Sequence, residues 1–180
     1  MEKRKLKIIG ISGSLRAASS ASAVLRIVAG LIPTNADFEI YGGLGEIPAF
    51  NDSNEIPATV QSLIDLITQA DAVFFCIPEY AFGVPGALKN AIDWTVSSVA
   101  FNDKPVALIT AASTGEKAHA AFLLTLTAIA TKKSAATSLL LPYIRNKMNA
   151  NGEMTDMLAL DAVTKVVHAL IASIEENEVG

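Results

Sequence analysis

Serine hydroxyls and one arginine cluster directly after the first apolar stretch of the chain. Residues 10–19 read Gly-Ile-Ser-Gly-Ser-Leu-Arg-Ala-Ala-Ser. Proteins bind phosphate groups with backbone amides at a helix N-terminus, with hydroxyl donors and with guanidinium groups. We call residues 10–19 the phosphate loop, because it supplies such side chains: Ser12, Ser14, Arg16 and Ser19. The alternative is an ordinary polar connection whose serines cap the next helix.

A second loop whose residues could bind a ligand follows another apolar run, residues 72–77. It begins Pro-Glu-Tyr-Ala-Phe-Gly, and we call these residues, 78–83, the ring loop. Consecutive backbone groups and an aromatic side chain suit a flat heterocycle, which has a hydrogen-bonding edge and an apolar face. Taken alone, the ring loop is also compatible with an ordinary junction between a strand and a helix.

Two common phosphate motifs are missing from the phosphate loop. It has no Gly-x-x-x-x-Gly-Lys-Ser/Thr sequence, and Gly10 and Gly13 lack the Gly-x-Gly-x-x-Gly spacing of dinucleotide-binding folds. The loop therefore favours a mononucleotide as the resident ligand over a dinucleotide.

Apolar runs alternate with helix-like segments along the whole chain. The expected strands are residues 6–12, 37–41, 71–77, 106–111 and 136–141, and the expected helices are residues 20–31, 57–70, 86–99, 117–131 and 156–176. Repeated units of this kind predict one α/β domain over residues 1–180, with a parallel sheet covered on both faces. Ligands of such sheets bind at the carboxyl ends of the strands where the strand order reverses, so we expect the two loops to meet there.

Composition excludes some functions and favours association with a second subunit. Hydrophobic residues make up 51% of the chain, charged residues only 18%, and the formal net charge is −4, which argues against a nucleic-acid partner. From residue 118 to 131 the only ionisable side chain is His119. A helix so apolar predicts a subunit interface, and the alternative is a well-covered helix inside a monomer.

We expect a cytoplasmic protein with no membrane partner. The single cysteine, Cys76, cannot form an internal disulfide, which suits a reducing compartment. No apolar run is expected to reach the length of a membrane span, and the basic start of the chain is expected to lead into a first strand rather than a signal peptide.

Together the two loops resemble the NADPH-dependent FMN reductase family of flavodoxin-like proteins, which includes flavin, quinone, azo-dye and chromate reductases. Residues 13–19 match the family's Gly-Ser-Leu-Arg-x-x-Ser motif, and residues 78–94 match its second motif, from Pro-Glu-Tyr to Asn-Ala-Ile-Asp-Trp. The resemblance covers nearly the whole chain. It implies a flavodoxin-like three-layer sandwich with a five-stranded parallel sheet in the order 2-1-3-4-5. It also implies non-covalent FMN, NADPH or NADH as co-substrate, and a homodimer or homotetramer.

The resemblance also implies three groups of flavin contacts. The phosphate loop would hold the FMN phosphate, the ring loop would lie along the isoalloxazine mainly through backbone groups, and a third loop would touch the pyrimidine end. The implied residues are Ser12, Ser14, Leu15, Arg16, Ser19, Pro78, Glu79, Tyr80, Ala81, Phe82, Ser113, Thr114, Gly115, Glu116 and Lys117. The flavin carries the chemistry, so no catalytic side chain and no metal site are expected.

This chain departs from the family pattern mainly near the polar edge of the ring. Ala81 stands where the family usually has Asn, Gly83 where Ser is usual, and Ala21 where an Asn commonly follows the first motif. The third loop lacks the usual Gly-Gly and following Arg, and reads Gly-Glu-Lys at residues 115–117. The phosphate end of the site therefore matches the family better than the ring end.

The resemblance implies an enzyme that passes electrons from a nicotinamide nucleotide through FMN to a small acceptor, such as a flavin, quinone, azo compound or chromate. One alternative is a flavin-binding electron carrier without its own NAD(P)H reaction, although such carriers are usually more acidic. Another is a serine esterase that uses Ser12 or Ser14. For the esterase, His168 has Asp161 only seven residues earlier on the same expected helix, which is a poor arrangement for a catalytic triad.

Overall fold

The computed structural model describes residues 4–53 and 55–179 of the chain. Its sheet has five strands in the order β2-β1-β3-β4-β5. Each neighbouring pair of strands is parallel. The strands are β1 (Leu6–Ser12), β2 (Ala36–Tyr41), β3 (Ala72–Ile77), β4 (Val106–Ala111) and β5 (Ser138–Leu141). The expected flavodoxin-like strand order is confirmed, and β1 and β3 flank the point where that order reverses.

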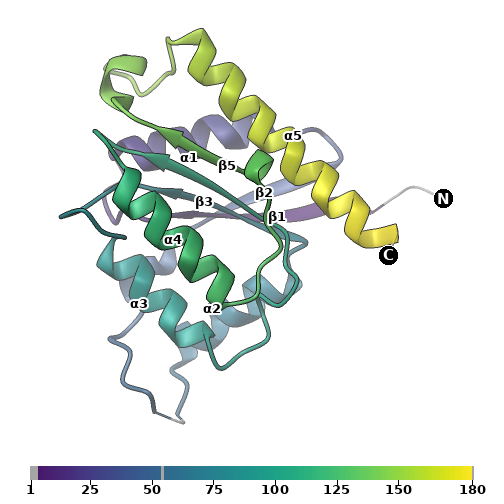
Figure 1. Cartoon of the computed structure of the whole chain (residues 1–180). Coiled ribbons are helices and arrows are strands. Elements are labelled where there is room, and N and C mark those ends of the chain that lie inside the picture. The colour runs from purple at the N-terminus through teal and green to yellow at the C-terminus, as the bar shows by residue number, and fades with distance from the viewer. Residues whose placement is uncertain (1–3, 54, 180) are drawn as a thin grey trace.

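Helices cover both faces of the sheet and make a three-layer sandwich. Figure 1 shows α1 and α5 on one face and α2, α3 and α4 on the other. These helices are α1 (Ser20–Leu31), α2 (Ala58–Gln69), α3 (Gly86–Thr95), α4 (Glu116–Ala128) and α5 (Met157–Val179). Three short 3₁₀ turns lie between the larger elements: η1 (Gly43–Glu46), η2 (Ala135–Thr137) and η3 (Ile144–Lys147).

The central strands are buried on both faces, as a parallel sheet requires. Every residue of β3 and β4 is buried. Successive side chains of a strand alternate between faces, so Phe74 packs in the core under α1 and α5 whereas Phe75 packs in the core under α2, α3 and α4. The Phe75 ring meets the edge of Phe122 from α4, with ring centroids 5.0 Å apart. The neighbouring Cys76 is fully buried in β3.

The bounds of β1, β4 and α1 agree with those expected from the sequence, whereas α3 and β5 are shorter. Helix α3 ends at Thr95 rather than at residue 99, because Val96 and the serines after it form turns in which Ser98 N donates to Thr95 O over 2.9 Å. Strand β5 begins at Ser138 rather than at residue 136. The preceding residues form η2, whose N-terminus is closed by a capping box between Ser134 and Thr137.

Helix α5 corrects the expectation that no apolar stretch reaches the length of a membrane span. Its residues Met157–Asn177 are long and apolar enough for one. One stripe of this helix, however, lies in the core beside α1 and β4: Ala159, Val163, Val166, Val167, Leu170 and Ile174. The apolar character of α5 is therefore explained in part by its packing on the sheet.

Candidate functional site

The phosphate loop and the ring loop meet at the carboxyl edge of the sheet. The amide of Gly13 donates a hydrogen bond to the carbonyl of Cys76 over 2.8 Å, which extends the pairing of β1 with β3. Beyond it, Ser14 Oγ and the phenolic oxygen of Tyr80 lie 3.1 Å apart and share a hydrogen bond. The expected meeting of the two loops at the switch point is thus confirmed, and this contact joins them directly.

The end of the phosphate loop forms the N-terminal cap of α1. Ser19 has extended backbone and its Oγ accepts a hydrogen bond from Ser22 N over 3.0 Å. This leaves other amides of the first turn free to face a ligand, at the positive end of the helix dipole. Arg16 is exposed beside the cap, and its guanidinium makes no hydrogen bond or ion pair with any residue of the described part of the chain.

The two earlier serines of the phosphate loop maintain its shape. Ser12 Oγ lies 2.9 Å from Ser22 Oγ, and Ser14 Oγ accepts a hydrogen bond from Arg16 N over 3.2 Å. The Ser14 side chain is buried, whereas the neighbouring Leu15 is 62% exposed. Both hydroxyls already have partners within the loops, so Arg16 and the amide end of α1 are the groups most available to an anion.

The tip of the ring loop is a tight two-residue turn. Tyr80 N donates to Gly83 O over 3.1 Å, and Gly83 N donates to Tyr80 O over 2.9 Å. The two residues between them, Ala81 and Phe82, have positive φ angles of 49° and 59°. A type I′ turn requires this geometry and favours Asn or Gly over other residues. The turn is therefore strained, and it presents the Phe82 side chain, 76% exposed, beside the site.

Placing an asparagine at residue 81 is expected to stabilise the protein. Asn adopts the left-handed conformation more easily than Ala, so Ala81→Asn should raise the free energy of unfolding by about 0.5–1 kcal/mol. Urea unfolding would measure the change. Ala150→Asn is a matched control, because Ala150 is an exposed loop residue without a positive φ. A gain in the control equal to that of Ala81→Asn would contradict the explanation by backbone strain.

The carboxylate of Glu79 binds the N-terminus of α4 and so joins the ring loop to the third loop. One oxygen accepts hydrogen bonds from Thr114 Oγ1 over 2.9 Å and Gly115 N over 3.3 Å, and the other accepts from Ala118 N over 3.0 Å. The hydrogen bond from Ala118, supported by those from Thr114 and Gly115, lowers the pKa of the Glu79 carboxyl. Helix α4 has no side-chain cap of its own at Gly115, so Glu79 supplies it from 36 residues earlier in the chain.

Removing the charge of Glu79 is expected to cost stability at neutral pH. Glu79→Gln should lower the free energy of unfolding by about 1 kcal/mol at pH 7, the usual effect of weakening a cap on a partly exposed helix end. The pKa of Glu79 is lowered on folding, so its contribution is complete above the unfolded value of about 4.3 and is lost as the pH falls through the folded value. The variant and the wild type should therefore converge in acid. Urea unfolding at pH 7 and pH 3.5 would measure both effects, and Glu116→Gln, in the same helix turn, should have the smaller effect.

A cavity of about 110 Å³ lies where the three loops converge. The lining side chains and backbone segments belong to Arg16, Ser19, Ser20, Pro78, Glu79, Tyr80, Ala111, Ala112, Ser113, Ile144 and Arg145. The structure thus brings together six of the residues that the sequence pointed to. Others lie around it: Ser12, Ser14 and Leu15 line a separate cavity of about 380 Å³ beside η1. Ala81, Phe82, Thr114, Gly115, Glu116 and Lys117 lie in the two adjoining loops without lining either cavity.

Sequence reasoning missed the segment after β5. Ile144 and Arg145 line the edge cavity together with Ser20 and Ala112. The position of this segment after a strand could have indicated it, because the carboxyl end of every strand in a parallel sheet reaches the same edge. The same rule that drew attention to the loops after β1 and β3 applies to the segment after β5.

The chemistry of these residues fits FMN. The exposed Arg16 and the amide end of α1 suit the phosphate group, and the ring loop next to them offers backbone groups and exposed aromatic surface to a flat heterocycle. The carboxylate of Glu79 is bound to the N-terminus of α4. It therefore does not pair with Arg16, which stays available to a phosphate.

Comparison with known proteins agrees with this chemistry. Residues 6–137 match the model of the family described as NADPH-dependent FMN reductase. An NAD(P)H-dependent FMN reductase of Pseudomonas aeruginosa is 32% identical over 174 residues, which is 92% of this chain and 93% of that protein. A quinone reductase of Escherichia coli is 37% identical over 94 residues, half of each chain.

A solved structure supports the same relationship. The flavoenzyme NAD(P)H:(acceptor) oxidoreductase of Paracoccus denitrificans superimposes with a TM-score of 0.82 at 25% identity, and the match covers 95% of this chain and 98% of that one. With a family match over most of its length and a full-length relative above 30% identity, the chain belongs to the NADPH-dependent FMN reductase family and is an FMN-dependent NAD(P)H oxidoreductase.

Proposed function

We propose that this enzyme binds FMN at the carboxyl edge between β1, β3 and β4 and passes electrons from NADPH or NADH to a small acceptor. One observation carries the assignment of the site: Arg16, the capped start of α1 and the ring loop all line one cavity at the point where the strand order reverses. In open parallel sheets this is the position at which nucleotides bind.

Different residues would bind the phosphate and the ring of the cofactor. Arg16 and the amides after Ser19 would bind the phosphate, and Pro78 to Tyr80 would lie along the ring. Bound FMN supplies the redox chemistry between the nicotinamide nucleotide and the acceptor. Two contacts fix the three loops relative to one another: the hydrogen bond between Ser14 and Tyr80, and the cap from Glu79 to α4. They would keep the binding groups for the ring and for the phosphate at a constant separation.

The surface around the site favours planar, apolar acceptors. Leu15, Tyr80 and Phe82 are exposed hydrophobic side chains on the phosphate loop and the ring loop. Aromatic faces of this kind attract flat rings and discriminate weakly among them. Relatives include the quinone reductase of Escherichia coli and an NADPH azoreductase of a Bacillus species, 35% identical over 114 residues. We infer that quinones, azo compounds and free flavins are acceptors, with chromate as a further candidate.

The absorption spectrum of the purified protein tests this proposal directly. With FMN bound, the protein should be yellow, and anaerobic NADPH or NADH should bleach the flavin absorption rapidly. Subsequent addition of a quinone should restore the colour. Bound flavin that neither nucleotide bleaches would instead support the electron-carrier alternative. Protein that binds no added FMN would contradict the proposed site.

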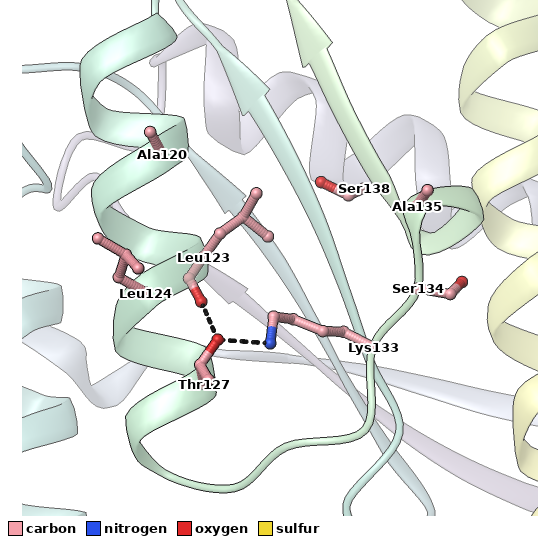
Figure 2. A pocket seen from close by; sticks show the side chains of 8 residues that line it. All are labelled: Ala120, Leu123, Leu124, Thr127, Lys133, Ser134, Ala135 and Ser138. Atoms are coloured by element: carbon pink, nitrogen blue, oxygen red, sulfur yellow. Dashed lines mark hydrogen bonds between the residues drawn. The ribbon is translucent and has the colours of Figure 1, made fainter.

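We also propose that α4 and the adjoining groove form an interface with a second copy of this chain. Figure 2 shows Leu123 and Thr127 of α4 turned toward Lys133 and the residues around η2, across a groove that these residues line. Leu124 also lines this groove. The groove measures about 750 Å³, and Leu124 is 73% exposed. Between Ala118 and Ala128 the helix carries no formal charge, and an exposed apolar face of this kind favours self-association. Sedimentation of wild type and Leu124→Glu would show a homodimer or homotetramer that the variant dissociates.

A cytoplasmic location completes the proposal. The full-length relative is an NAD(P)H-dependent reductase, and both nicotinamide nucleotides are cytoplasmic cofactors. The fully buried, unpaired Cys76 suits a reducing compartment. Fractionation of cells that produce the protein would test this location, and recovery with the membranes would contradict it.

A further inference from the structure

A second arginine lies at the proposed flavin site, on the segment after β5. Arg145 lines the same edge cavity as Arg16 and Ser19, and it also lines an adjoining cavity of about 330 Å³ beside Ser19 and Ser20. We propose that Arg145 is a second binding residue for the 5′-phosphate of FMN. Together with Arg16 it sets the preference of the protein for FMN over riboflavin, which lacks the phosphate. The inference rests on the proposed function.

The backbone around Arg145 is fixed against the loop after β4. Tyr143 N donates to Ser113 O over 3.0 Å, and Ile144 N donates to Ala112 O over 3.2 Å. The Ile144 side chain is buried in the core under α1 and α5. Tyr143, with a φ of 53°, turns the chain sharply just before η3. Arg145 therefore projects from a segment that two backbone hydrogen bonds and a buried anchor hold at the carboxyl edge.

The cavity carries two positive charges that the chain does not balance. Within residues 4–53 and 55–179, neither Arg16 nor Arg145 has a side-chain hydrogen bond or ion pair. Glu79 is the carboxylate among the lining residues, and hydrogen bonds from Thr114, Gly115 and Ala118 already occupy it. Two guanidinium groups beside one small cavity repel each other unless an anion lies between them. The arrangement therefore favours an anionic ligand with more than one negative charge.

A phosphate monoester has the matching charge. It carries about −1.5 to −2 at pH 7. The amide end of α1 is equivalent to about +0.5, and Arg16 adds one full charge, which leaves part of a dianion without a partner. The guanidinium of Arg145 completes the balance. Its planar array of donors also suits phosphate oxygens, which accept paired hydrogen bonds from arginine.

Flavin titrations of single and double variants test the role of Arg145. Dissociation constants for FMN and for riboflavin would be measured by fluorescence quenching at one fixed ionic strength. Arg145→Gln is expected to weaken FMN binding about tenfold and to change riboflavin binding less than about twofold, since a charge-assisted hydrogen bond contributes about 1.5 kcal/mol or more and 1.4 kcal/mol is tenfold. Arg145→Lys should recover part of the loss. Lys165→Gln, which removes an exposed cation of α5 paired with Asp161, should leave both constants unchanged.

The double variant shows whether both arginines act on the same group. With Arg16→Gln and Arg145→Gln combined, the loss in FMN affinity should differ from the product of the single losses, because residues that bind one group couple energetically. The protein should then bind FMN and riboflavin with similar affinity.

Other outcomes would overturn the inference. One is an Arg145→Gln protein with the wild-type affinity for FMN, and another is an equal loss of affinity for FMN and riboflavin. An unchanged FMN dissociation constant together with a raised KM for NADPH would assign the arginine to the nicotinamide nucleotide. If Arg16→Gln loses FMN while Arg145→Gln does not, this inference fails and the proposed function stands. Wild-type protein that binds neither flavin would instead overturn the proposed function.

Discussion

Gly115→Ala is expected to destabilise the protein by about 2–5 kcal/mol and to weaken FMN binding as well. Gly115 caps α4 with a φ of 89°, a conformation that costs an alanine about 1–2 kcal/mol. A Cβ at this residue would lie 2.9 Å from Leu140 Cδ1, 3.0 Å from Thr110 Cγ2 and 3.1 Å from Ala112 Cβ. Crowding of this degree in a packed site adds about 1–3 kcal/mol.

The effect on FMN follows from the position of Gly115. Its amide donates to Glu79, so any shift of the backbone there moves the third loop away from the ring loop. Chemical unfolding and flavin titration would measure the two effects. Gly30→Ala is the matched control: Gly30 is exposed within α1, a Cβ there meets open space, and the change should leave stability equal or raised by up to about 1 kcal/mol. If Gly115→Ala unfolds at the wild-type urea concentration, the account of this cap is wrong.

Arg16→Gln is expected to weaken FMN binding by about 10- to 100-fold while leaving the fold intact. Arg16 is exposed and has no hydrogen-bonded or ionic partner in the described chain, so its loss removes no contact that supports the structure. A charge-assisted hydrogen bond to an anion contributes about 1.5–3 kcal/mol, which corresponds to that range of affinity. The melting temperature without flavin should stay at the wild-type value.

Riboflavin and salt provide the controls for Arg16→Gln. Riboflavin carries no phosphate, so its dissociation constant should change little in the variant. The FMN affinity of the wild type should fall with increasing salt, and that dependence should be weaker in the variant. An Arg16→Gln protein with unaltered FMN affinity would show that this guanidinium does not contact the phosphate.

Local patterns in the sequence were enough to predict most of the fold. The apolar runs of β1, β3 and β4 stand out because both faces of these strands are buried, and the serine cap marks the start of α1. The expected bounds of an element were wrong where local hydrogen bonds compete with the regular helix or strand. The capping box at Ser134 and Thr137 shortens β5, and β-branched and small polar residues end α3 at Thr95.

The candidate site was harder to predict because part of it depends on contacts between distant residues. The sequence pattern selected the phosphate loop and the ring loop, and the structure joins them through Ser14 and Tyr80. The cap that Glu79 places on α4 spans almost forty residues, and no local pattern encodes it. Arg145 has no motif around it; only the sheet topology brings it to the same edge as Arg16.

The placement of Cys76 in β3 bears on whether the proposed quinone acceptors could inactivate the protein. Quinones are electrophiles that alkylate thiolates, and an enzyme that handles them risks inactivating itself. Here the one sulfhydryl of the chain is fully buried in the core under α1 and α5, and burial raises its pKa far above the normal range. We therefore expect the folded protein to resist iodoacetamide and to turn over reactive quinones repeatedly without covalent damage at this residue.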